Sequence, residues 1–213
     1  MVNPFTWKSR LGPQTPVAAS SSDWAHGTEH PFLFVGGLDD SHSYKQPENL
    51  LETVARLKER GIDVYLTLVG DGNRRPALEK MVSMMGCADT VTFAGRVSDQ
   101  DLCRLYDEAY ALIVPSSSDT EGFGLVIIEA LSHGCPVIAS EALPSTARYS
   151  HGHGVLSFGP AVSESLGERI SELISRPSLR EELVKGSRLV DFRSDNEAGL
   201  QTMVRLILGE NSA

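Results

Sequence analysis

Residues 114–140 read VPSSSDTEGFGLVIIEALSHGCPVIAS: a short apolar run, a polar loop with two glycines, a helix-forming stretch and a second apolar run. This order predicts a strand, a loop, a helix and another strand, which is the repeating unit of parallel sheets. The loop follows the carboxyl end of the first strand, where ligands bind in open α/β sheets. The segment therefore indicates both a fold class and a place for a functional site.

The chain from residue 31 onward repeats this alternation of apolar runs and amphipathic segments. Most of the runs are too apolar to face water on either side, which is typical of parallel strands covered by helices on both faces. We therefore expect a doubly wound parallel α/β sheet with helical C-terminal segments. The predicted strands span residues 32–35, 64–69, 91–93, 111–114, 137–139 and 155–158.

Capping signals mark several of the predicted helices. Ser98 followed by Asp101 resembles a capping box ahead of a helix that ends near residue 110, and Ser178 with Glu181 repeats the pattern. Other boundaries follow from prolines at helix starts and glycines past helix ends. The other predicted helices span residues 47–61, 76–86, 162–175, 179–189 and 196–208.

The chain divides into three predicted parts. Residues 1–30 have no periodic pattern, and we expect a loosely ordered N-terminal extension there. Residues 31–192 form the predicted Rossmann-like domain, and residues 193–213 a C-terminal helix and tail.

Composition and charge exclude several classes of protein. The 213 residues include 28 acidic and 19 basic side chains, and the net charge of −9 disfavours nucleic acid or anionic lipid as the main partner. No apolar run approaches the ~18 residues of a membrane span. The first 25 residues lack a secretory signal, so we expect a cytoplasmic protein whose three cysteines are reduced core thiols.

The glycine-rich loop has the chemistry of an anion site. Gly122 and Gly124 let the backbone turn tightly and approach a ligand, and the free amides of the following helix attract a phosphate. Glu121 lies in the loop and Glu129 lies about one and a half turns into the helix. Two carboxylates on either side of a phosphate suit the hydroxyls of a nucleotide sugar.

Glu121 and Glu129, within EGFGLVIIEA and followed by GCPVIAS, resemble the two-glutamate motif of the family 4 (group 1) retaining glycosyltransferases of the GT-B fold. The resemblance implies that Glu121 contacts the donor sugar and Glu129 the ribose. It also implies that the phosphate is held by the amides of Phe123, Gly124, Leu125 and Val126. On the residues alone, Glu121 as a helix cap and Glu129 on a solvated helix face remain an alternative.

A second segment, FVGGL at residues 34–38 followed by Lys45, resembles the first strand of that family and its phosphate-binding lysine. By resemblance Gly36 and Gly37 border the donor and Lys45 stabilises the departing diphosphate; the alternative is an exposed lysine ahead of a helix. The family commonly has arginine where Gly37 stands. Arg74 or Arg75 is a candidate for that missing charge, or an ordinary surface residue.

Other polar residues receive smaller roles. The segment VTFAGRV at residues 91–97 resembles the strand and turn that border the nucleobase, which makes Arg96 and Val97 candidate base contacts. Residues 99–101 have the spacing of an acidic metal motif, but Ser98 caps the same helix. His151 and His153 lack a third ligand nearby. We therefore expect no metal and no cofactor.

The resemblance implies a donor-binding domain that transfers a sugar from a UDP-, GDP- or ADP-sugar with retention, as a metal-independent, hexosyltransferase-like enzyme. Thirty residues before the first strand are too few for an acceptor domain, so a separate acceptor subunit or a homo-oligomer is the expected partner. A non-catalytic nucleotide-sugar sensor or regulatory subunit is the alternative function. A third hypothesis, an unrelated flavodoxin-like binding module, leaves the 121–140 segment unexplained.

Overall fold

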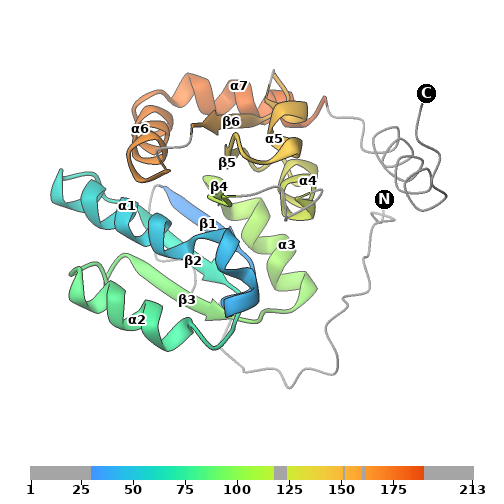
Figure 1. The fold of residues 1–213 in the computed structure, drawn as a ribbon. Coiled ribbons are helices and arrows are strands. Elements are labelled where there is room, and N and C mark those ends of the chain that lie inside the picture. Colours follow the sequence, from blue (N-terminus) through green and yellow to red (C-terminus); the bar gives the residue numbers. More distant parts are fainter. Residues whose placement is uncertain (1–29, 118–123, 151, 160–161, 190–213) are drawn as a thin grey trace, which may run out of the picture.

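The computed structural model describes residues 30–117, 124–150, 152–159 and 162–189. Within these residues one parallel sheet has the strand order β3-β2-β1-β4-β5-β6 (Figure 1). The doubly wound parallel sheet predicted from the sequence is therefore confirmed. The strands are β1 (Pro31–Val35), β2 (Tyr65–Val69), β3 (Val91–Gly95), β4 (Ala111–Val114), β5 (Val137–Ser140) and β6 (Val155–Phe158).

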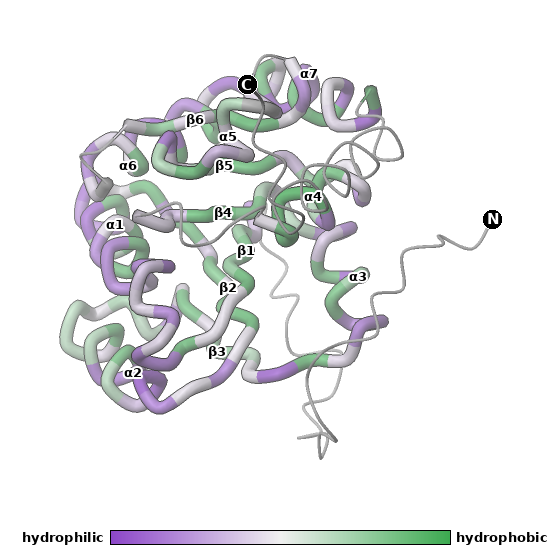
Figure 2. The backbone as a smooth tube through the Cα atoms, turned by 45° about the vertical axis from the view of Figure 1, so that its right-hand side comes forward, coloured by the Kyte–Doolittle hydropathy of each residue, from purple (hydrophilic) through white to green (hydrophobic). Residues whose placement is uncertain are grey.

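The apolar runs of the sequence mark the strands because the sheet is covered on both faces. Each predicted strand is confirmed to within two residues at either end. The tube of Figure 2 is coloured as hydrophobic along β4 and β5, and every residue of these two strands is buried. Parallel strands that exclude water from both faces need such runs.

Helices cover the two faces, and each face has its own core. Phe32 and Phe34 of β1 join the core that includes Leu50, whereas Leu33 between them joins the core that includes Ile127. This alternation follows from the two-residue period of a strand. One face carries α1 (Pro47–Glu59), α2 (Arg75–Met84) and α6 (Val162–Ser175), and the other α3 (Asp99–Glu108), α4 (Leu125–Ser132) and α5 (Pro144–Tyr149) (Figure 1).

One of the two predicted caps is confirmed and the other is wrong. The Ser98 hydroxyl accepts the amide of Asp101 at 3.1 Å and donates to its carboxylate at 2.6 Å, so α3 begins as predicted. The last described helix, α7 (Pro177–Ser187), begins two residues before the predicted start, and its N-cap residue Arg176 makes no side-chain capping bond. Pro177 at the first helical position already suits a helix start, so Ser178 lies inside the helix.

The cysteines only partly match the prediction of core thiols. All three are free, and Cys87 and Cys135 are buried, but Cys103 is exposed. Cys103 lies on α3, where Tyr106 rather than Cys103 faces the sheet. The prediction of a core position was wrong for Cys103 because α3 buries little of its surface.

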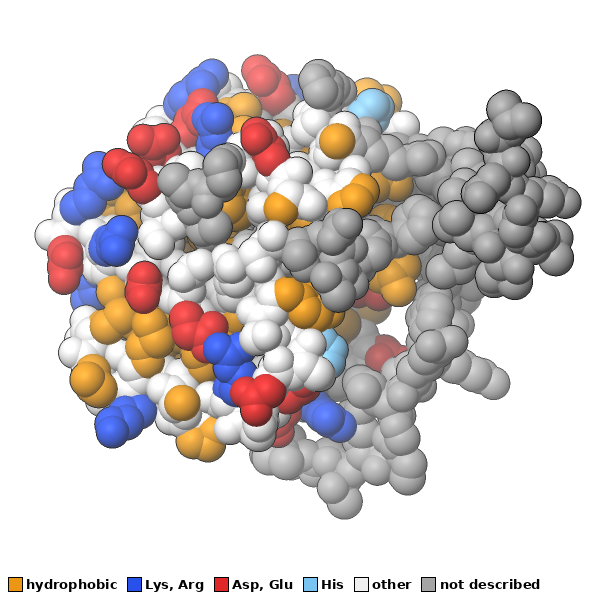
Figure 3. Space-filling model, viewed as in Figure 1, with side chains coloured by type: hydrophobic (Ala, Val, Ile, Leu, Met, Phe, Trp, Pro, Cys, Tyr) orange, Lys and Arg blue, Asp and Glu red, His pale blue; other side chains and the backbone are white. Residues whose placement is uncertain are grey.

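The space-filling view shows acidic and basic side chains interspersed on the face drawn (Figure 3). In the part of the chain that the structure describes, no helix has the length and apolar character needed to cross a membrane. The predicted N-terminal extension, apart from residue 30, and the predicted helix at 196–208 lie outside the described residues.

Candidate functional site

The candidate site lies at the carboxyl edge of the sheet, where the strand order reverses. From β1 the chain proceeds outward to β2 and β3, and then returns to the other side of β1 with β4. The loops after β1 and β4 therefore meet, and the amide of Ser117 donates to the carbonyl of Tyr44 at 2.9 Å. Ligands of open α/β sheets bind at such a switch point.

The turn after β1 packs closely on the end of β2. The amide of Gly36 donates to the carbonyl of Val69 at 2.9 Å. A Cβ atom on Gly70, whose φ is +137°, would lie 1.8 Å from the carbonyl oxygen of Gly36. Only glycine fits at position 70, and the close approach holds the Gly36 turn against the sheet.

Lys45 ends the 3-10 helix η1 (Asp40–Lys45) and lies over the backbone of Gly36. A Cβ atom on Gly36 would come within 2.6 Å of Lys45 Cδ, so the absence of a side chain there leaves the path for the lysine. Lys45 is only 9% exposed, and its Nζ lies 5.5 Å from the ring centroid of Tyr44. The alternative of a solvent-exposed lysine is therefore wrong.

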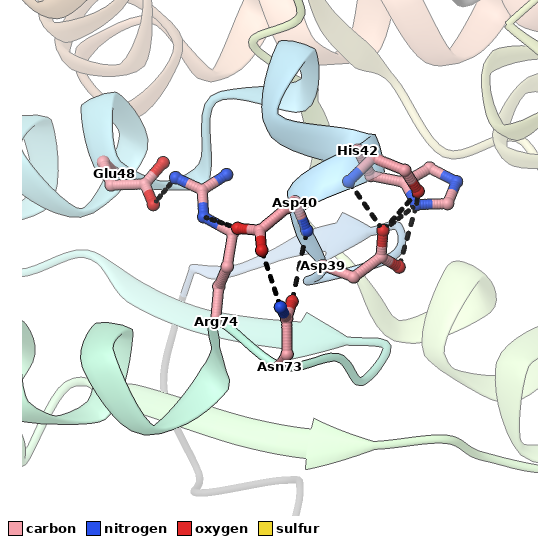
Figure 4. Close-up of polar contacts among 7 residues, drawn as sticks. Asp39, Asp40, His42, Glu48, Asn73 and Arg74 are labelled. Carbon is pink, nitrogen blue, oxygen red and sulfur yellow. Dashed lines mark hydrogen bonds and ion pairs between the residues drawn. The ribbon is translucent and has the colours of Figure 1, made fainter.

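The space beside Gly37 is filled by His42, which the sequence analysis did not select. A Cβ atom on Gly37 would lie 2.8 Å from His42 Nδ1. That nitrogen lies 2.8 and 2.9 Å from the two carboxylate oxygens of Asp39 (Figure 4). Hydrogen bonds from Ser41 and His42 lower the pKa of Asp39. Asp39 and His42 are three residues apart in a loop, and this spacing was the feature of the sequence that could have indicated their contact.

Two arginines, Arg74 and Arg75, were candidates for the positive charge that the family has at position 37. Both are paired with carboxylates. Arg74 pairs with Glu48 and lies 3.9 Å from Asp40, and Figure 4 shows it on the other side of Asp40 from His42. Arg75 Nε donates to Glu79 at 2.7 Å, one helical turn away. The geometry favours the reading of both as structural surface residues.

Helix α4 follows β4, so its N-terminus lies at the same carboxyl edge of the sheet. Its N-cap residue is Gly124, which adopts the left-handed conformation with φ +55° and makes no side-chain capping bond. The first amides of a helix, here those of Leu125 and Val126, have no acceptor within the helix itself. Leu125 is half exposed and Gly124 buried, and the helix dipole favours an anion at this end.

Glu129 is not on a solvated helix face. Its Oε2 accepts a 3.0 Å hydrogen bond from the hydroxyl of Tyr106 on α3. Burial raises the pKa of Glu129, and the bond from Tyr106 partly offsets that rise. The pKa of Tyr106 is raised well above its ordinary value, mainly by burial and to a smaller extent by the charge of Glu129. Glu129 is thus a partly buried carboxylate with a fixed orientation.

Tyr106 is itself held by the end of α4. His133, the C-cap residue of α4, stacks on the Tyr106 ring with centroids 5.6 Å apart. His133 Nδ1 lies 2.8 Å from a carboxylate oxygen of Asp107, which follows Tyr106 on α3. The two helices therefore share a polar network beside Glu129 that the sequence analysis did not anticipate.

Arg96 and Val97 follow β3, at the carboxyl edge of the sheet. Arg96 is exposed and Val97 packs against the core on the α3 side. β3 is separated from β1 by β2, so the two residues lie farther along the edge than Lys45. Their role as base contacts stays a prediction.

Two predicted site residues, Glu121 and Phe123, lie in segment 118–123, outside the described residues. Their roles also stay predictions. Within the described ranges, no group of three His, Cys, Asp or Glu side chains has the arrangement of a metal site. His151 is outside these ranges, and His153 is exposed.

Comparison with known proteins identifies the family. The profile of the family described as "Glycosyl transferases group 1" matches residues 22–190. An alpha-D-kanosaminyltransferase of Streptomyces kanamyceticus is 27% identical over 155 residues, which make up 73% of this chain and 39% of that protein. The chain thus spans about two fifths of the length of this curated relative.

Two solved structures share the fold. HepE of Anabaena, solved in complex with UDP, has 21% identity and a TM-score of 0.65 over 82% of this chain and 48% of its own. The C-terminal domain of a group 1 family glycosyltransferase from Francisella tularensis has 21% identity and a TM-score of 0.62, over 80% of this chain and 90% of its own. Because its sheet is that of the GT-B C-terminal domain and the family profile matches most of its length, the chain belongs to the group 1 glycosyl transferases.

Proposed function

We propose that this chain is the donor-binding part of a group 1 glycosyltransferase that uses a UDP-, GDP- or ADP-sugar and retains the anomeric configuration. The observation that carries the proposal is the meeting of the Lys45 loop and the loop leading to α4 at the β1–β4 switch point, where Ser117 bonds to Tyr44. The site would thus have a cation and a helix N-terminus at one edge of the sheet. That pair of groups suits a diphosphate.

The diphosphate would lie between Lys45 and the amides of Leu125 and Val126. As the bond to the sugar breaks, negative charge grows on the diphosphate, and a fixed ammonium stabilises that charge more than the charge of the bound substrate. Lys45 is suited to this because burial over Gly36 restricts its side chain. With a lysine and helix amides to neutralise the leaving group, we propose a metal-independent reaction.

The ribose would bind at Glu129. A carboxylate has several acceptor positions, and the hydrogen bond from Tyr106 occupies only one of them. The remaining positions are available to the ribose hydroxyls. We assign Glu121 to the donor sugar, Phe123 to the phosphate turn, and Arg96 and Val97 to the base.

The acceptor would be bound by another part of the assembly. The chain spans 39% of the kanosaminyltransferase and 90% of the isolated C-terminal domain from Francisella tularensis. We therefore propose that acceptor residues come from a further domain, a separate subunit or a second copy of the chain. Retention follows if the acceptor attacks on the face from which the diphosphate departs.

Calorimetric titration with UDP, GDP and ADP tests the proposal. We expect saturable binding of one nucleotide, weakened at least about tenfold by Lys45→Met because a charge-assisted contact is lost. Lys80→Met on the exposed surface of α2 removes the same charge elsewhere and is expected to leave the affinity unchanged. Absence of binding, or equal losses in the two variants, would contradict the proposal. If the chain binds a nucleotide but neither hydrolyses nor transfers a donor sugar in any combination of subunits, the result favours the alternative of a sensor.

A further inference from the structure

Helix α5 carries two buried hydroxyl groups that have no hydrogen-bond partner among the residues that the structure describes. They belong to Ser145, which is 6% exposed, and Thr146, which is 1% exposed. Neither Ser145 Oγ nor Thr146 Oγ1 has a partner within residues 30–117, 124–150, 152–159 and 162–189. Buried polar side-chain atoms are nearly always paired in proteins, so such a group calls for an explanation, and a ligand is one.

The two hydroxyls differ in what lies beside them. Ser145 Oγ lies 3.0 Å from the position that a Cβ atom on Gly124 would occupy. Among the described residues other than the chain neighbours of Gly124, Ser145 Oγ is the nearest heavy atom to that position, followed by two side-chain carbons of Ile127. Ser145 therefore places its hydroxyl against the N-cap of α4, and a side chain at position 124 would crowd it.

The topology explains why Ser145 reaches this point. α5 begins just after the carboxyl end of β5, and β5 pairs in parallel with β4. The loops after both strands therefore leave the sheet at the same edge. α4 has eight residues, and its N-cap Gly124 makes no side-chain capping bond.

We propose that Ser145 is a donor-site residue whose hydroxyl donates a hydrogen bond to a diphosphate oxygen held at the N-terminus of α4. The proposal rests on the proposed function, since it adds a side-chain donor to that site. A hydroxyl suits the position because it donates without a charge of its own and can rotate toward the oxygen. The ligand supplies the partner that the protein does not.

The test compares Ser145→Ala with Thr146→Val in the full chain, by calorimetric titration with UDP. Ser145→Ala is expected to weaken UDP binding about tenfold, the size of one hydrogen bond to a charged group. Thr146→Val also removes a buried, unpartnered hydroxyl and is expected to bind UDP like the wild type. Uridine, which has no phosphate, is expected to bind the wild type and Ser145→Ala equally.

Thermal unfolding separates a binding role from a structural one. Ser145→Ala removes no hydrogen bond within the described part of the chain, so its Tm without ligand is expected to equal or exceed that of the wild type. Ser145→Cys, which keeps a side chain of similar size but is a weak donor, is expected to lose UDP affinity as well. It serves as the second variant if Ser145→Ala fails to fold.

The outcomes separate this inference from the proposed function. If the wild type binds UDP and Ser145→Ala binds it equally well, the role of Ser145 is overturned while the donor site stands. Equal losses in Ser145→Ala and Thr146→Val overturn it too, because they indicate a general effect on α5. If the wild type binds none of UDP, GDP and ADP, both proposals fail.

Discussion

The hydroxyl of Tyr106 donates a hydrogen bond of 3.0 Å to Oε2 of Glu129, and this bond joins α3 to α4. Tyr106 is 2% exposed, so the bond is sheltered from water on the tyrosine side. His133 stacks on the tyrosine ring and fixes its plane. A carboxylate oriented in this way needs little reorganisation on meeting a ligand.

Tyr106→Phe is expected to weaken UDP binding about fivefold, since Glu129 loses the hydrogen bond that orients it. That bond also lowers the pKa of Glu129, so its removal is expected to raise this pKa further and to move the acid limb of the binding profile to higher pH. Titrations across a pH series measure both effects. Tyr65→Phe, at the amino end of β2, is the matched control, and an unmoved acid limb in Tyr106→Phe contradicts the positioning role.

Glu129→Gln is expected to weaken UDP binding without lowering the stability of the fold. Burial raises the pKa of Glu129 in the folded state, so the folded protein holds this proton more tightly than the unfolded chain does. Stability is therefore lost as the pH rises from the unfolded pKa, near 4.5, through the folded one. The variant lacks this penalty, and at pH 7 its Tm is expected to equal or exceed that of the wild type.

The same variant is expected to bind UDP about tenfold more weakly, because an amide is a poorer acceptor for ribose hydroxyls than a carboxylate. The stability gain over the wild type should shrink below about pH 4.5, where Glu129 is protonated in both states. Glu108→Gln, at an exposed position of α3, is expected to change neither quantity. A large loss of stability at pH 7 in Glu129→Gln would show that the buried charge is favourable.

Gly70→Ala is expected to destabilise the fold by about 3 kcal/mol or more, because the new Cβ atom would meet the Gly36 carbonyl oxygen at 1.8 Å. Gly61→Ala provides the control: Gly61 also has a positive φ, of +77°, but nothing lies within 4 Å of its Cβ position. Its expected cost is only about 1 kcal/mol, for the left-handed backbone alone. Denaturant unfolding measures both, and equal costs contradict the close packing of the Gly36 turn.

Cys103 is expected to be the cysteine that reacts first with a thiol reagent in the native chain. It is exposed, whereas Cys87 is buried and burial raises the pKa of Cys135 to about 12. Only a thiolate reacts, and a buried thiol cannot form one readily. Spectrophotometric thiol titration at pH 8 should show one fast equivalent, absent in Cys103→Ser, and three equivalents in denaturant. Fast reaction of the Cys103→Ser variant contradicts the burial of the other two.

The amino-acid sequence was enough to predict the strands, their order along the chain and the edge of the sheet at which the candidate site lies. The bounds of the strands at residues 111–114 and 155–158 were predicted to the residue. Strands that are buried on both faces are continuous apolar runs, which can be recognised in the sequence. The Ser98 cap was predicted because a capping bond joins residues three apart. Such features depend on neighbours in the chain, and a sequence displays them directly.

Other features depend on residues that only folding brings together. Tyr106 and Glu129 are 23 residues apart, and Ser145 meets Gly124 through two helices that follow adjacent strands. No periodicity encodes such contacts, since they arise from the register of helices packed on a sheet. The same holds for Lys45, which the sequence left as either a phosphate-binding lysine or an exposed lysine ahead of a helix. The local pattern thus decided which elements form, and the packing of those elements decided which side chains share a site.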